Sequence, residues 1–216
     1  MAGTARSFEL VDTDRTDLRF LDALSDLFAE DGTIYLVSGY FTYQGYLAIR
    51  DDIFSFLERN RQNELILIVG PASDQFSPRI AHELWKRDAF DQVQLFKQPR
   101  GLHAKLYFRD GPMPRIIIGS ANITRVAIEY NTELNIMFGR GQANHPDIEP
   151  IREWVTGLVD SSKPLRRFDI VAPVLILSSL LNWSNKAMIL PPRNVVLRAI
   201  PILLLLLLFG SIMRII

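Results

Sequence analysis

Short runs of consecutive branched aliphatic residues constrain the fold of this chain more than any other feature. The segment 64–69 reads ELILIV and is followed by Gly70 and Pro71, and the segment 115–120 holds three isoleucines in succession. Runs of this length that end at turn residues are typical of strands buried on both faces. We therefore expect a sheet whose central strands are covered from both sides.

Segments with apolar residues at helical spacing alternate with these strand segments. Helices are expected over 16–28, 46–59, 77–86 and 147–159, and strands over 33–37, 64–69, 93–96, 103–108, 115–120 and 132–138. This alternation predicts an α/β fold with a mixed β-sheet flanked by helices. We expect residues 1–160 to form one domain of this class.

The composition changes beyond residue 160. Residues 170–183 and 199–213 are two apolar runs, and the second is flanked by Arg198 and Arg214. A helix over 199–213 would rise about 22 Å, which is less than the roughly 30 Å of a bilayer's hydrocarbon core. Three interpretations of the hydrophobic extension 161–216 stay open: membrane contact through 199–213, packing in a core or against a partner, or a truncated or mis-read chain end.

Charge and cysteine content narrow the classes of function. Lys and Arg number 24, as do Asp and Glu, and this balance argues against a protein that coats nucleic acid broadly. There is no cysteine, which excludes disulfides and thiolate metal sites. The N-terminus carries no apolar run, so we expect no secretory signal and a cytoplasmic location, either free or tethered through the C-terminal segment.

The stretch 101–133 concentrates the residues suited to chemistry. His103, Lys105 and Asp110 are spaced as H-x-K-x-x-x-x-D, and the chain continues with Gly119-Ser120-x-Asn122 and then Glu133. Polar and apolar residues alternate over 103–108, which predicts a strand with the imidazole and the ammonium on one face. This pair suits an anionic substrate. Adjacent strands would gather five side chains around one pocket: His103, Lys105, Ser120, Asn122 and Glu133.

Several candidates have a competing structural interpretation. Asp110 precedes Gly111 and Pro112, so it is equally typical of a turn. Tyr40 and Phe41 follow an expected strand and are candidates for stacking on a substrate or for ordinary packing.

Other basic and histidine residues also have competing interpretations. Arg100 is a substrate-binding candidate within a local set of basic residues: Lys97, Arg100, Lys105, Arg109, Arg115 and Arg125. For the members other than Lys105, the competing interpretation is a solvated surface. His82 and His145 lack a lysine two residues on and are interpreted as helix surface and loop.

This constellation resembles the phospholipase D superfamily, whose HxKxxxxD signature with a trailing G-S-x-N is filled here at every position. The resemblance implies phosphodiester chemistry through a covalent phosphohistidine, with no metal or cofactor. It implies that His103 is nucleophile or acid, that Lys105, Ser120 and Asn122 bind phosphate, that Glu133 orients His103, and that Asp110 supports the site. The scheme needs two histidines and the chain has one H-x-K, so we expect a two-fold homodimer with the site across its interface.

Three functions follow from this resemblance. The first is a metal-independent endonuclease of the phospholipase D-like nuclease branch that acts on nucleic acid, DNA in the first instance. The second is a phospholipid-processing enzyme at a membrane, which the apolar C-terminal segment favours. The third is a non-catalytic nucleic-acid-binding module of the same fold, against which the intact motif argues.

Overall fold

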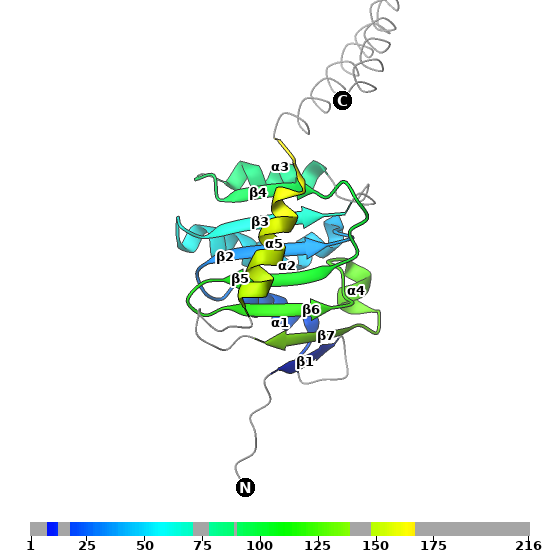
Figure 1. Cartoon of the computed structure of the whole chain (residues 1–216). Coiled ribbons are helices and arrows are strands. Elements are labelled where there is room, and N and C mark those ends of the chain that lie inside the picture. The colour runs from blue at the N-terminus through cyan, green and yellow to red at the C-terminus, as the bar shows by residue number, and fades with distance from the viewer. Residues whose placement is uncertain (1–7, 13–17, 71–77, 89, 139–147, 167–216) are drawn as a thin grey trace, which may run out of the picture. The chain divides into compact units, whose positions relative to one another are not determined.

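A computed structural model of the chain describes residues 8–12, 18–70, 78–88, 90–138 and 148–166. These residues form an eight-stranded mixed sheet with helices on both faces (Figure 1), which confirms the expected fold class. The strands are β1 (Glu9–Asp12), β2 (Thr33–Ser38), β3 (Glu64–Val69), β4 (Val93–Lys97), β5 (Lys105–Asp110), β6 (Arg115–Gly119), β7 (Leu134–Phe138) and β8 (Lys163–Pro164), in the order β1-β7-β6-β5-β2-β3-β4-β8. The helices are α1 (Phe20–Leu27), α2 (Tyr43–Arg59), α3 (Pro78–Arg87), α4 (Arg125–Glu129) and α5 (Glu149–Asp160).

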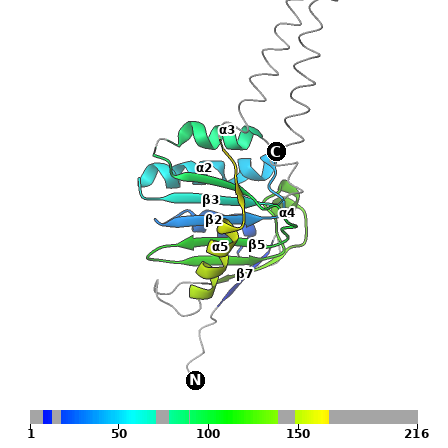
Figure 2. The same cartoon turned by 45° about the horizontal axis from the view of Figure 1, so that its top comes forward.

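Apolar side chains fill the space on each side of the sheet. Helices α1 to α4 pack on one face through a core that includes Phe20, Ile49, Ile80 and Tyr107. Helix α5 crosses the other face (Figure 1), and its Val155 is fully buried. Figure 2 shows α2 and α3 along the face opposite α5. The central apolar runs are therefore covered from both sides, as their composition requires.

The strand directions create one edge at which several loops meet. Strands β2, β3 and β4 are mutually parallel, and β5 runs antiparallel to β2 with Lys105 opposite Ser38. Strand β6 is antiparallel to both β5 and β7. The ends of β2, β3 and β6 and the starts of β5 and β7 therefore lie along the same side of the sheet. We call this row of strand ends, which is not an outermost strand, the site edge.

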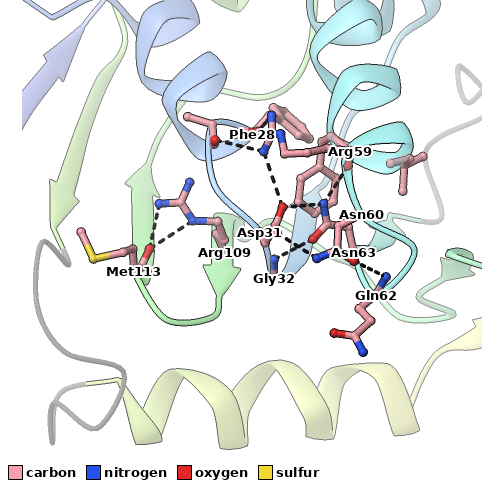
Figure 3. A network of polar contacts seen from close by, with 12 residues as sticks. Phe28, Asp31, Gly32, Arg59, Asn60, Gln62, Asn63, Arg109 and Met113 are labelled. Atoms are coloured by element: carbon pink, nitrogen blue, oxygen red, sulfur yellow. Dashed lines mark hydrogen bonds and ion pairs between the residues drawn. The ribbon is translucent and has the colours of Figure 1, made fainter.

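At the opposite row of strand ends, which we call the closed edge, side chains form hydrogen bonds to the ends of helices (Figure 3). The guanidinium of Arg59 donates to the carbonyl oxygens of Phe28 and Ala29 at 3.0 Å, just beyond α1. Asn63 Nδ2 lies 2.7 Å from the carbonyl oxygen of Phe56 and 3.0 Å from Asp31. The last carbonyl groups of a helix have no partner within the helix, so these bonds stabilise both helix ends.

Arg109 on β5 adds further hydrogen bonds to the closed edge. Its buried guanidinium donates to the carbonyl oxygens of Asp26 and Leu27 at the end of α1 and to that of Met113 in the β5–β6 turn. Gly32 lies against the same edge with φ of +146°, and a Cβ there would be 2.2 Å from the Asp110 carbonyl oxygen. Only glycine fits this close approach.

The structure differs from the sequence-based expectations at several elements. Strands β1 and β8 and the short helix α4 were not predicted, and β8 carries the sheet past residue 160 through its pairing with β4. Ile118 was expected in the core but is 39% exposed. The apolar runs 170–183 and 199–213 and His145 lie outside the described residues. Among the residues that the structure does describe, no helix has both the length and the apolar character needed to cross a bilayer.

Candidate active site

His103 and Lys105 lie where β5 begins, at the site edge. Residues 101–104 form no regular structure and β5 starts at Lys105, so His103 precedes the strand instead of lying within it as predicted. His103 is exposed, whereas Lys105 is only 6% exposed. The Lys105 amine donates a hydrogen bond to the carbonyl oxygen of His103 at 2.7 Å. The two residues are therefore tied together through the main chain.

The burial of Lys105 changes its ionisation. Loss of hydration lowers the pKa of the Lys105 amine, and the negative charge of Glu133 partly opposes that change. A cation that has lost part of its hydration attracts a phosphoryl oxygen more strongly than one in bulk water. Lys105 is therefore suited to hold an anionic group beside His103.

Ser120 and Glu133 form a hydrogen-bonded pair at the same edge. The Ser120 hydroxyl donates to Glu133 Oε2 and accepts from the amide of Leu134 at 3.1 Å. The other carboxylate oxygen of Glu133 accepts from Asn131 Nδ2 at 3.0 Å. Across the described residues, no hydrogen bond joins Glu133 to the His103 imidazole, so the role of Glu133 in orienting that ring stays a prediction.

Asn122 connects the turn after β6 with the turn after β2. Its Oδ1 accepts from the backbone amide of Tyr40 at 3.1 Å and lies 3.3 Å from the Ser38 hydroxyl. Glycine precedes this turn because a Cβ on Gly119 would lie 2.4 Å from the Leu134 carbonyl oxygen. The structure thus brings five predicted residues to one edge of the sheet: His103, Lys105, Ser120, Asn122 and Glu133.

Buried polar side chains that the sequence analysis missed hold the turn after β6. The Tyr107 hydroxyl donates to the carbonyl oxygen of Ala121 at 2.6 Å, and the amide of Ala121 donates to Asn135 Oδ1 at 3.2 Å. The Ser38 hydroxyl accepts from the amide of Ile123 at 3.3 Å. Alternation along 103–108 places Tyr107 on the same face as Lys105, and the structure shows that this face is buried.

The three predicted substrate-binding residues differ in their exposure. Tyr40 is 40% exposed beside Asn122, and Arg100 is also exposed. Phe41 is fully buried in the core and forms an isolated β-bridge with Ile123. The structure therefore corrects the assignment of Phe41, because its ring has no surface to offer a substrate.

Asp110 is not brought together with the other motif residues. It ends β5, about 17 Å along the strand from Lys105 at the usual rise per residue. Its carboxylate instead accepts hydrogen bonds from Arg152 on α5, at 2.7 Å from Nη2 and 2.9 Å from Nε. Asp110 thus fastens α5 to the sheet, and its place in the motif is structural.

The local set of basic residues is also dispersed. Arg109 and Arg115 lie at the closed edge, where Arg115 pairs with Asp26 at 2.8 Å. Arg125 pairs with Glu129 on α4.

His82 is exposed on α3, as expected. In the ranges that the structure describes, no group of three or more His, Asp or Glu side chains is placed to hold a metal ion.

Comparison with known proteins identifies the fold. No protein-family profile matches the chain, and no curated protein matches it in sequence. Among solved structures, Nuc from Salmonella typhimurium, a phospholipase D family member, aligns over 74% of this chain and 98% of its own with a TM-score of 0.56 and 17% identity. NucT from Helicobacter pylori aligns over 73% of this chain and 98% of its own with a TM-score of 0.54 and 15% identity. Phosphatidylserine synthase from Haemophilus influenzae gives a TM-score of 0.56 at 13% identity, over 73% of this chain and 40% of its own.

Proposed function

Because the chain has the phospholipase D fold, we propose that it is a phosphodiesterase whose active site lies at the site edge. The observation that carries this proposal is the pairing of an exposed imidazole, His103, with a buried cation, Lys105. The Asn122 amide lies at the same edge and adds donors for phosphoryl oxygens, and the Ser120 hydroxyl would join it by exchanging its hydrogen bond to Glu133 for one to the substrate.

The chemistry would proceed in two steps. An imidazole nitrogen of His103 attacks phosphorus, the P–N bond forms, and the P–O bond to the leaving group breaks as that oxygen takes a proton from a second imidazole. Water then attacks phosphorus, gives its proton to the second imidazole, and the P–N bond breaks. Lys105, Ser120 and Asn122 stabilise the charge on the non-bridging oxygens in both steps.

The second imidazole would come from His103 of a second copy of the chain. An exposed apolar row adjoins the site and supports this arrangement: Leu10, Ile136 and Ile118 pair across β1, β7 and β6 and are 44%, 39% and 39% exposed. Leu134, which follows Glu133 directly, is 58% exposed. Apolar surface of this kind is typical of contact between subunits. We define these four residues as the apolar row.

The favoured substrate is a nucleic acid. Tyr40 is exposed beside Asn122, where its ring can stack on a base next to the scissile phosphate. Phospholipid is the alternative substrate, because phosphatidylserine synthase shares this fold over part of its length. A non-catalytic binding module is the third candidate, and it predicts that His103 is dispensable for every measured activity.

The test uses bis(p-nitrophenyl) phosphate, supercoiled plasmid, single-stranded DNA and labelled phospholipid vesicles, each in excess chelator. We expect hydrolysis that His103→Ala lowers by roughly 10⁴-fold or more. The matched control His82→Ala should keep wild-type rates, since His82 is exposed on α3. Wild-type turnover by His103→Ala contradicts the proposal, and a strict need for added Mg²⁺ contradicts its metal-independent form.

A further inference from the structure

The hydroxyl of Ser38 occupies a fully buried position at the centre of the site edge. Ser38 is the last residue of β2 and pairs with Lys105 across the ladder, so both side chains lie on the same face. Its hydroxyl lies 2.7 Å from the Tyr40 carbonyl oxygen and 3.3 Å from Asn122 Oδ1. It also accepts from the amide of Ile123 at 3.3 Å. One hydroxyl therefore fastens the turn after β2 to the turn after β6.

The orientation of the Asn122 side chain follows from these contacts. The backbone amide of Tyr40 can only donate, so the Asn122 atom 3.1 Å away must be the oxygen Oδ1. The Ser38 hydroxyl lies 3.3 Å from the same oxygen. The Nδ2 group is then directed away from both, and no described residue accepts a hydrogen bond from it. Its two N–H groups remain available to a substrate.

We propose that Ser38 is a positioning residue that holds Asn122 with its N–H groups directed at the reacting phosphoryl group. This inference rests on the proposed phosphodiesterase function and names a residue outside the sequence motif. A hydrogen-bond donor that is fixed before the substrate arrives needs no reorganisation during the reaction. It can therefore stabilise the negative charge that develops in the transition state. Without the Ser38 hydroxyl, only the Tyr40 amide would hold the Asn122 oxygen, and the N–H groups would be aligned less firmly with the anion.

A double-mutant cycle measures this dependence with bis(p-nitrophenyl) phosphate. Asn122→Ala should lower kcat by roughly 10²- to 10³-fold, as for other lost transition-state donors. Ser38→Ala should lower kcat by roughly 10- to 100-fold through misplacement of the donor, with a smaller change in KM. If Ser38 acts through Asn122, Ser38→Ala should have no further effect in the Asn122→Ala background. Losses that multiply in the double variant overturn the proposal.

Asn122→Asp provides a test that does not depend on removing Ser38. This change keeps an oxygen for Tyr40 and the Ser38 hydroxyl but replaces the N–H groups by a second oxygen. We expect at least the loss seen for Asn122→Ala, because the carboxylate repels the phosphoryl group. Near-wild-type activity would mean that Asn122 only holds the turn, and the inference would be wrong.

Two controls separate this inference from the proposed function. Ser25→Ala removes a hydroxyl of the same size that bonds Asp52 at 2.7 Å, away from the site, and should leave kcat unchanged. His103→Ala, measured in parallel, reports on the function itself. Hydrolysis at the wild-type rate by His103→Ala contradicts the phosphodiesterase proposal. Loss of hydrolysis in His103→Ala together with a wild-type kcat in Ser38→Ala contradicts only the positioning role of Ser38.

Discussion

Asp110 and Arg152 form a two-pronged ion pair that joins the end of β5 to α5. Guanidinium nitrogens Nη2 and Nε lie 2.7 Å and 2.9 Å from the carboxylate oxygens, and each side chain is 26% exposed. The hydrogen bonds to Asp110 raise the pKa of Arg152 further, so this guanidinium stays charged at neutral pH. The aspartate of the sequence motif therefore joins α5 to the sheet at the edge opposite His103 and Lys105.

Removal of the Asp110 carboxylate should reduce stability and leave catalysis intact. We expect Asp110→Ala to lower the free energy of unfolding by about 1–2 kcal/mol, as for a partly exposed bidentate pair. Arg152→Ala should give a similar loss, and the double variant less than the sum. Urea denaturation measures the first quantity, and kcat and KM measured well below the unfolding midpoint check the second. A hundredfold fall in kcat with unchanged stability would return Asp110 to the active site.

Lys105 should give the KM for substrate a distinctive dependence on pH. Burial lowers the pKa of this amine below the ordinary 10.5, so it loses its charge at a lower pH than a free lysine does. Phosphate binding is then strong at neutral pH and weakens as the pH rises through the lowered pKa, and KM rises there. In Lys105→Arg the guanidinium stays charged, so KM should remain flat across the same range. An identical alkaline rise in both proteins would show that another group titrates.

Tyr40 and Phe41 should respond to truncation in opposite ways. Tyr40 is 40% exposed, so Tyr40→Ala should leave stability nearly unchanged and raise KM for single-stranded DNA by roughly 5- to 100-fold through lost stacking. Phe41 is fully buried, and Phe41→Ala should lower the free energy of unfolding by about 3–5 kcal/mol. Steady-state kinetics on single-stranded DNA measure KM, and chemical denaturation measures the free energy of unfolding, for both variants. Equal KM values for Tyr40→Ala and the wild type would remove Tyr40 from the substrate site.

A charge in the apolar row should separate the proposed dimer. Ile136→Asp places a carboxylate at the middle of the row, and we expect a monomer near 24.7 kDa in light scattering together with loss of hydrolysis. Met113→Asp is the matched control, since Met113 is 52% exposed in the β5–β6 turn at the other edge. That control should remain dimeric and active. A fully active Ile136→Asp monomer contradicts both the interface and the shared site.

The sequence was sufficient to predict the fold class, and it indicated which residues of the motif lie at the same edge of the sheet, because both depend on local patterns. The run 64–69 coincides with β3, and the spacing from Lys105 to Asn122 follows from two antiparallel strands and their turn. Asp110 shows where local reasoning stops, since its partner Arg152 lies 42 positions along the chain. Ser38 was missed because its contacts with Asn122 and Ile123 join segments that only the sheet brings together. Strands β1 and β8 are too short to give a periodic signal.

The two-residue strand β8 has a consequence for how the molecule behaves in a crowded solution. Lys163 and Pro164 pair with Lys97 and Phe96, so β8 covers the last two residues of β4, which would otherwise be open on that side. Proline has no amide proton to donate, and a lysine beside it adds charge. Within the described residues, a foreign strand that approached over Phe96 and Lys97 would find little to pair with. Strand β8 therefore keeps this end of β4 from pairing with another chain, independent of any catalytic role.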